Sequence, residues 1–267
     1  MSTPATATPV LEARALSAAR GGRPVLHGVS FSLHARAACA LVGPNATGKS
    51  TLVRALAGLL PLTSGGVWLH GRPLSAWTRS ALARIVALVA TDEQGPATLT
   101  VHDRVALGRY PHRGPFRPLT GEDEQAVWRG LRHTGIEHLA QRRLGTLSAG
   151  ERQLATLARG LAQEPQILLL DEPSAHLDVG HQLQLFRVLH EVRARGVAVL
   201  AVVHDLGRAA AWAEHMAVLH EGRLVAEGPP DAVLAGEACS RAFGVAVRRH
   251  AVAGLAHPLY SFEEVSS

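Results

Sequence analysis

The sequence has few lysines, cysteines and aromatic residues, and it has no long apolar segment. Phe, Trp and Tyr make up only 4% of the 267 residues, and two residues are cysteine. Every apolar run is broken within about ten residues by Arg, Asp, Glu or Gly, whereas a membrane-spanning helix needs about 20 apolar residues. The first ten residues lack the basic and apolar regions of a signal peptide. We therefore expect one domain that buries a single core and stays in the cytoplasm.

Neither the cysteines, the histidines nor the net charge indicates a metal site or a nucleic-acid interface. Cys39 and Cys239 lie far apart and have no metal-like spacing, so we expect two buried small side chains. The fifteen histidines include no HExxH motif and no i, i+4 pair. The net charge of +5 is spread along the chain without a basic patch, so no nucleic-acid partner is expected.

Lys49 is the only lysine in the chain, and arginine supplies the rest of the positive charge. The lysine ammonium is a compact charge on a flexible stem, whereas the guanidinium of arginine is planar and broad. Because this sequence uses Arg wherever a solvated charge suffices, position 49 indicates a place where a compact cation is needed.

Residues 43–51, GPNATGKST, lie between a predicted strand and a predicted helix. Alternating apolar runs over 10–42 predict antiparallel strands that lead into a buried strand, and apolar positions over 51–60 recur at helical spacing. The segment fits the phosphate-loop pattern G-x-x-x-x-G-K-[ST], in which backbone N–H groups and Lys49 hold phosphates and Ser50 ligates Mg²⁺. An ordinary glycine-rich turn is the alternative. The expected nucleotide contacts are Gly43, Pro44, Asn45, Ala46, Thr47, Gly48, Lys49, Ser50 and Thr51.

Two adjacent carboxylates, Asp171 and Glu172, follow an apolar strand that begins at Ile167. Successive side chains of a strand point to opposite sides. Asp171 can therefore face a metal ion, directly or through water, while Glu172 polarises the attacking water as general base. The alternative is a helix N-cap in the following turn, which does not account for the uninterrupted apolar residues before the two acids.

The remaining elements alternate between helices and strands. Helices are expected at 100–109, 121–134 and 149–163, with an exposed loop over 110–121. From Ile167 onward the pattern predicts a strand, a helix from about Asp178 to Arg195, a strand at 197–203, a helix and a short strand pair around 220–223. Strands that alternate with helices imply a parallel sheet with right-handed crossovers.

Residues 147–153, LSAGERQ, resemble the LSGGQ-type signature of ABC (ATP-binding cassette) ATPases. Residues 174–178, SAHLD, resemble the family's D-loop, and His204 in VVHDL resembles its switch histidine. Together with the phosphate loop and the two carboxylates, these elements follow the family's order over almost the whole chain. The resemblance implies an α/β fold, with a P-loop NTPase core that has a parallel sheet, N-terminal antiparallel strands and a helical insert at about 92–160. It also implies a single ABC domain over 1–267.

The same resemblance implies a head-to-tail dimer with a second copy of the ATPase subunit. In such a dimer, Ser148 and the backbone of Gly150 contact the γ-phosphate of ATP held by the other subunit's phosphate loop. His204 would bond the γ-phosphate and report hydrolysis, so Glu172, His204 and Lys49 are the expected catalytic residues. Asp178 would shape the contact between the subunits.

Two further segments resemble the ATPase subunits of importers for iron-siderophore, haem or cobalamin. They are ALGRYPHRG at 106–114 and EGPPDAVLAGEACSRAFGVAVR at 227–248, toward the end of the chain. The resemblance implies transmembrane permease subunits as partners, with 108–112 near the contact, and a solute-binding protein as an indirect partner. It also implies a peripheral position on the cytoplasmic face of the inner membrane. A simple solvent-exposed loop is the alternative for 108–112.

Four residues depart from the family's usual pattern. Arg20 stands where an aromatic residue stacks on adenine, and a guanidinium plane can also stack on a base. Ala46 replaces a phosphate-loop glycine, which costs about 1–2 kcal/mol if the position needs a positive φ. Ala149 replaces a signature glycine, and Ala175 replaces a polar D-loop residue.

A fifth departure concerns the glutamine that, in the family, contacts Mg²⁺ and the lytic water. By length Thr91 occupies that position, so Thr91 joins Ser50 and Asp171 as an expected metal contact, and Gln94 is a possible substitute. We therefore expect slow or tightly regulated hydrolysis.

Two other functions remain alternatives. An ABC ATPase of DNA repair or chromosome structure needs a long coiled coil before the signature, and one of translation carries two cassettes; neither fits this chain. A degenerate cassette that binds ATP without turnover is the second alternative, and the departures above are its support.

Overall fold

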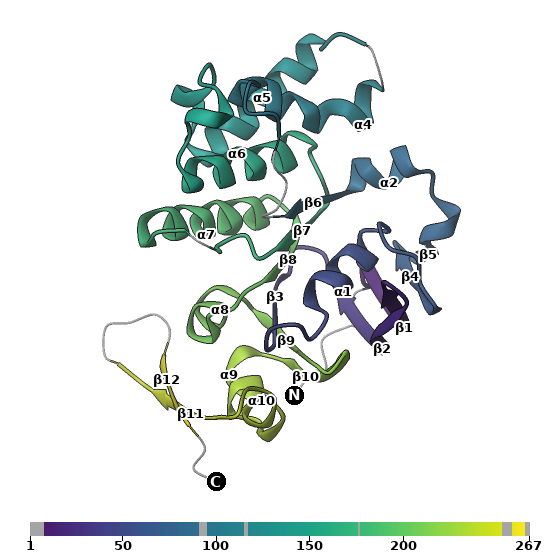
Figure 1. Cartoon of the computed structure of the whole chain (residues 1–267), viewed down its shortest axis with the longest axis vertical. Coiled ribbons are helices and arrows are strands. Elements are labelled where there is room, and N and C mark those ends of the chain that lie inside the picture. Colours follow the sequence, from purple (N-terminus) through teal and green to yellow (C-terminus); the bar gives the residue numbers. More distant parts are fainter. Residues whose placement is uncertain (1–7, 91–94, 115–116, 176, 253–257, 265–267) are drawn as a thin grey trace. The chain divides into compact units, whose positions relative to one another are not determined.

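A computed structural model describes residues 8–90, 95–114, 117–175, 177–252 and 258–264. The chain divides into two compact units, Met1–Ala76 with Leu200–Ser267, and Trp77–Val199. Figure 1 labels most of the helices and strands of both units. No helix of the described part of the chain is long and apolar enough to cross a bilayer.

The first unit contains an antiparallel sheet with strand order β2-β1-β4-β5. Its strands are β1 (Leu11–Arg20), β2 (Arg23–Leu33), β4 (Ser64–Leu69) and β5 (Arg72–Pro73), followed by a short 3₁₀ turn at Leu74–Ala76. Leu11 and Ala13 of β1 are buried and, after an irregularity at Arg14 and Ala15 that shifts the register, Leu16 and Ala18 are buried, so a period of two holds on each side of the irregularity. The turn between β1 and β2 is Gly21–Gly22, where both residues have positive φ. The predicted N-terminal antiparallel strands are confirmed.

A second group of strands in this unit leads to the phosphate loop. All five residues of β3 (Ala38–Val42) are buried, and β3 pairs in parallel with β9 (His215–His220), which pairs antiparallel with β10 (Arg223–Gly228). The helix α1 (Lys49–Leu56) follows β3 directly. The first unit also contains the helices α8 (Leu206–Trp212), α9 (Pro230–Ala235) and α10 (Glu237–Phe243).

The chain ends in a hairpin that the sequence did not predict. It consists of β11 (Val245–His250) and β12 (Leu259–Glu264), which pair antiparallel. Arg248 forms an ion pair with Glu263 across the hairpin at 2.9 Å, and Arg249 pairs with Asp231 at the start of α9 at 3.2 Å. The ion pair with α9 therefore helps to place the hairpin.

The second unit combines a parallel strand pair with a helical cluster. The strands are β6 (Val86–Ala90) and β7 (Ile167–Asp171), and β8 (Ala198–Val202) begins in this unit and ends in the first. The helices are α2 (Arg79–Ile85), α3 (Val101–Ala106), α4 (Tyr110–Arg113), α5 (Gly121–Thr134), α6 (Ala149–Ala162) and α7 (Val179–Ala194). Three short 3₁₀ turns lie at Leu107–Arg109, Glu137–Leu139 and Leu144–Thr146.

The helical cluster of α3, α5 and α6 has its own apolar core, formed among others by Val105, Leu131 and Leu154. Each of the three helices begins with a capping box, in which a Ser or Thr and an acidic residue three positions later bond each other's backbone N–H. These local signals explain why the predicted helices at 121–134 and 149–163 agree with α5 and α6.

The predicted exposed loop over 110–121 is wrong at its start, because Tyr110–Arg113 forms the helix α4. Tertiary contacts hold this turn in place. The carbonyl of Pro111 accepts hydrogen bonds from Ser80 Oγ (3.1 Å) and Arg84 Nε (2.9 Å), and His112 Nε2 lies 2.9 Å from the carbonyl of Gln163. None of these partners is close in sequence, so the local pattern gave no sign of the helix.

Candidate nucleotide-binding site

The phosphate loop lies between the buried strand β3 and the N-terminus of α1, as predicted. Lys49 is the first residue of α1 and is only 4% exposed. Its ammonium group donates to the carbonyls of Gly43 (2.8 Å) and Pro44 (2.7 Å), so the side chain folds back along the loop. Thr47 Oγ1 also donates to the Pro44 carbonyl, at 2.9 Å. The only lysine of the chain is therefore held inside the loop that the sequence assigned to phosphate.

The N-terminus of α1 suits an anion. The first turn contains no acidic residue, and the N-cap, Gly48, provides no side chain to bond the helix N–H groups. N–H groups that no side chain caps and the helix dipole both favour negative charge at this position. Gly48 has φ of 103°, and an added Cβ would lie 2.9 Å from Leu26 Cδ2. The residues present therefore fit the phosphates of a nucleotide.

Ala46 has φ of 61°, in the left-handed region. The cost predicted for alanine at this position depends on a positive φ, and that condition is met. An L-residue there costs about 1–2 kcal/mol relative to the right-handed conformation. The loop of this protein thus contains local strain that a glycine would not have.

Arg20 and His204, the other predicted site residues of the first unit, are both exposed. Arg20 is the last residue of β1 and pairs with Arg23 across the hairpin turn. His204 follows the end of β8 and precedes α8, whose N-cap is Asp205. The Asp205 carboxylate accepts from the backbone N–H of Arg208 at 2.9 Å. A cap therefore fixes the backbone immediately after His204.

In the second unit, Asp171 is the last residue of β7 and is 5% exposed, whereas Glu172 is only half-buried. Glu172 has φ of 53°, which is unusual for a residue with a side chain. Such strain is often found where a structure holds a functional side chain in place. The alternative role, a helix cap, is contradicted, because the N-cap of α7 is Asp178.

The predicted signature residues form the start of α6. The backbone N–H of Ser148 donates to Glu151 Oε2 (2.7 Å), and the N–H of Glu151 donates to Ser148 Oγ (3.1 Å). The hydrogen bond from the Ser148 backbone is the main reason that the pKa of Glu151 lies below its usual value. Ser148 and Ala149 are exposed, while Gly150 is buried. The Ser148 hydroxyl accepts the cap bond from the backbone of Glu151.

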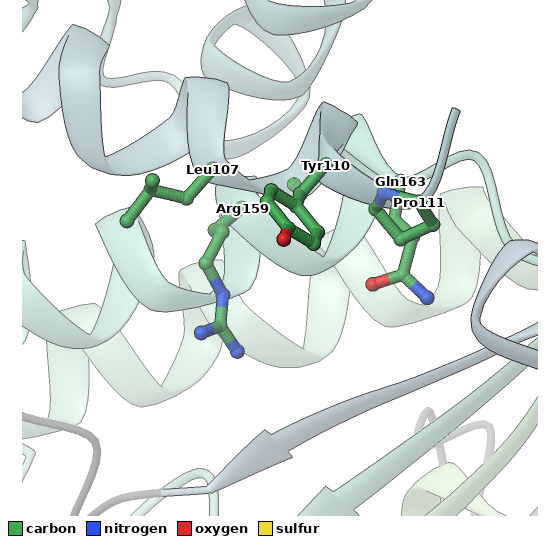
Figure 2. A pocket seen from close by; sticks show the side chains of 6 residues that line it. Leu107, Tyr110, Pro111, Arg159 and Gln163 are labelled. Carbon is green, nitrogen blue, oxygen red and sulfur yellow. The ribbon is translucent and has the colours of Figure 1, made fainter. Parts of the chain in front are cut away.

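A surface pocket of about 360 Å³ lies beside the segment 108–112 (Figure 2). Its lining residues are Leu107, Gly108, Tyr110, Pro111, Arg159 and Gln163. Leu107 is 43% and Tyr110 is 51% exposed, so the pocket offers apolar surface. A Cβ at Gly108 would lie 2.2 Å from the Arg159 carbonyl, which explains why this segment reaches α6 only with glycine.

Sequence reasoning found 108–112 but missed Arg159 and Gln163 on the facing helix. Arg159 is in the last turn of α6 and Gln163 is the C-cap residue, one turn later, so helical spacing places them on one face. Their involvement depends on packing between segments that are distant in sequence. Thr91 and Gln94, predicted near the metal, lie outside the described residues.

The family model described as "ABC transporter" matches residues 26–175, which is more than half of the chain. The chain belongs to the ABC transporter family. The match includes the phosphate loop, the signature and the Asp171–Glu172 pair.

Curated ABC relatives match most of the chain. The Ferric enterobactin transport ATP-binding protein FepC of Escherichia coli (strain K12) is 42% identical over 207 residues, which are 77% of this chain and 76% of FepC. The Hemin import ATP-binding protein HmuV of Nocardia farcinica is 41% identical over 261 residues, which are 96% of this chain and 88% of HmuV. The predicted ABC-type ATPase is therefore confirmed.

Solved ABC structures share the fold. An inward-facing metal-chelate type ABC transporter has a TM-score of 0.83 at 23% identity and covers 96% of this chain and 98% of its own. A nucleotide-free ATP-binding cassette has a TM-score of 0.77 at 23% identity, and the match covers 88% of this chain and 95% of that cassette. The predicted α/β cassette with parallel and N-terminal antiparallel strands is confirmed.

Proposed function

We propose that this chain is the ATP-hydrolysing subunit of an ABC importer for iron-siderophore, haem or cobalamin, and that 1–267 is one cassette domain with its helical insert at about 92–160. One observation carries the ATPase assignment: the only lysine lies in a phosphate loop that opens onto a helix N-terminus without a side-chain cap. The substrate class follows from the relatives, whose names give ferric enterobactin and hemin.

The nucleotide contacts are the loop residues 43–51, with Arg20 stacking on the base. The Ser50 hydroxyl and the Asp171 carboxylate fit Mg²⁺, which binds oxygen ligands. Ser50, Asp171 and Thr91 would hold the ion, which neutralises charge on the phosphates when bound. Glu172 takes the proton of the attacking water, and His204 orients the γ-phosphate. Lys49 stabilises the charge that develops on the phosphate oxygens.

A second copy of the chain completes the proposed site. Ser148 and the Gly150 backbone would contact ATP held by the phosphate loop of the other copy. Two features of the second unit support this role. The Ser148 hydroxyl is exposed at a helix N-terminus, and Val179 and Leu183 on α7 leave apolar surface exposed (66% and 62%) near Asp178. Exposed apolar side chains of this kind are typical of interaction surfaces.

The pocket beside 108–112 is the proposed contact for the transmembrane permease subunits. Its apolar rim, formed by Leu107 and Tyr110, suits the apolar side chains of a partner helix. The solute-binding protein would act only through the permease. The chain would therefore lie peripherally on the cytoplasmic face of the inner membrane.

A degenerate cassette that binds ATP and barely hydrolyses it is the second candidate. The positive φ of Ala46 favours it, since strain in the phosphate loop opposes the geometry that turnover needs.

The test is transport by the reconstituted complex. The chain and its permease, placed in liposomes with ATP inside, should take up a ferric siderophore or haem, and Lys49→Ala should stop uptake. ATP binding without hydrolysis by the intact complex would support the degenerate cassette. Uptake that is independent of ATP would contradict both candidates.

A further inference from the structure

His181 lies near the start of α7 and packs against Gly150 at the start of α6. It is the third residue of α7, and its backbone N–H donates to Asp178 Oδ1 at 2.9 Å. Its ring nitrogen Nδ1 lies 2.7 Å from Asp178 Oδ2. An ionised carboxylate can only accept hydrogen bonds, so Nδ1 carries the proton and donates. These two bonds are the main cause of the lowered pKa of Asp178.

The imidazole ring of His181 covers Gly150 of the signature. A Cβ added at Gly150 would lie 2.4 Å from Cγ of the ring, 2.5 Å from Cδ2 and 2.7 Å from Nδ1. These distances are far below van der Waals contact, so the ring occupies the space of a side chain. This packing explains why Gly150 is buried and retained, whereas the neighbouring position 149, which is exposed, contains alanine.

One side chain therefore joins two helix caps. The start of α6 is fixed by the reciprocal bonds of Ser148 and Glu151, and the start of α7 by Asp178. His181 bonds the Asp178 carboxylate and packs on the Gly150 backbone. The imidazole thus sets the distance between the Ser148 hydroxyl and the Asp178 backbone.

We infer that His181 is a positioning residue, which holds the signature turn and the D-loop in one arrangement so that both meet the second subunit together. This inference rests on the proposed composite site. His181 acts through Ser148 and Asp178 and touches no reacting atom. The energy of one hydrogen bond to a charged group, with ring packing in addition, is what keeps the two turns in register.

The experiment measures ATP-dependent dimerisation in a Glu172→Gln background, which prevents hydrolysis. His181→Ala should raise the Kd of the ATP-bound dimer about tenfold, the loss expected from one hydrogen bond to a charged group. Binding of a fluorescent ATP analogue by the monomer should not change, because the phosphate loop is intact. The matched control is His190→Ala, which removes an exposed histidine from the same helix.

A conservative variant separates positioning from helix capping. His181→Asn places an amide N–H where Nδ1 lies and should recover most of the dimer affinity. In a double-mutant cycle, Ser148→Ala and His181→Ala should weaken the dimer together by less than the product of their single effects, because they act on the same turn.

The outcomes distinguish an error in the proposed composite site from an error in the role of His181. If the Glu172→Gln parent forms no ATP-dependent dimer, the proposed composite site is wrong. If the parent dimerises and His181→Ala dimerises equally well, the inference is wrong. Equal losses of melting temperature and of dimer affinity in His181→Ala and His181→Asn would show that the ring only stabilises α7, and this would also overturn it.

Discussion

The phosphate loop and the signature turn are both helix N-termini, yet the protein builds them in opposite ways. The start of α1 has a glycine N-cap and no acidic residue, so its first-turn N–H groups have no side-chain cap. The start of α6 is closed by Ser148 and Glu151, which satisfy each other's backbone N–H groups. The proposed phosphate-binding turn therefore has no side-chain cap of its own, whereas the proposed signature turn is fixed by its own side chains.

Glycine also has different tasks in the two turns. Gly48 in the phosphate loop adopts φ of 103°, which few other residues tolerate. Gly150 lies inside a helix, and its task is to leave room for the imidazole of His181. Replacement by alanine is therefore a question of backbone conformation in one turn and of packing in the other.

The largest expected effect is at Lys49. Lys49→Ala should lower ATP turnover by at least about 100-fold, because it removes the charge that stabilises the transferred phosphoryl group. Phosphate release by the purified chain measures it, and Lys49→Arg should not rescue, since a guanidinium does not fit the same carbonyls. Turnover at the parent rate would show that residues 43–51 do not form the nucleotide site.

The second prediction is that the phosphate loop of one subunit and the signature turn of the other form one site. Lys49→Ala and Ser148→Arg chains, both with Glu172→Gln, should each form few ATP-dependent dimers alone, because every site of such a dimer is defective. A mixture should form ATP-dependent dimers, because one of its two sites pairs an intact phosphate loop with an intact signature. Size-exclusion chromatography measures the dimer fraction. If each variant dimerises alone as well as the mixture does, the site is not shared between subunits.

The third prediction sharpens the contrast between adjacent signature positions. Gly150→Ala should lower the free energy of unfolding by about 1–3 kcal/mol, the usual cost of overpacking, because the ring of His181 must move. Ala149→Gly should cost only about 0.5–1 kcal/mol. Urea denaturation measures both. Adding His181→Ala to Gly150→Ala should relieve the clash, and a purely additive loss would contradict this packing.

The fourth prediction concerns the strained loop. Ala46→Gly should raise the free energy of unfolding by roughly 0.5–1 kcal/mol, because release of the left-handed strain exceeds the entropic cost of glycine. The same substitution at Ala57, which has φ of −75°, should destabilise. A loss of stability in Ala46→Gly would show that the loop does not hold this conformation.

The smallest effect is the pH dependence of the signature cap. The pKa of Glu151 is lowered in the folded protein, first by the backbone hydrogen bond from Ser148. A lowered pKa means that the stabilisation is present above the unfolded value of about 4.3 and is lost as the pH falls below it. The melting temperature of Glu151→Gln should therefore fall slightly less than that of the parent between about pH 5 and pH 3. An unchanged acid profile would show that this carboxylate contributes nothing measurable.

The site was predictable from the sequence to the extent that its parts are local. The strand–loop–helix at β3 and α1 follows from a buried run, a glycine-rich turn and helical spacing. The capping box that starts α6 could also be found by its spacing. The short helix α4, the lining of the pocket and the C-terminal hairpin were missed, because each depends on partners distant in sequence.

The sequence by itself determined the order of the predicted phosphate-binding and signature motifs and the family to which the chain belongs, because motifs and helix signals depend on near neighbours. Only the tertiary structure decided that Ala46 is strained and that His181 covers Gly150. Such features arise when separate segments pack to native density, where a single Cβ or ring decides what fits.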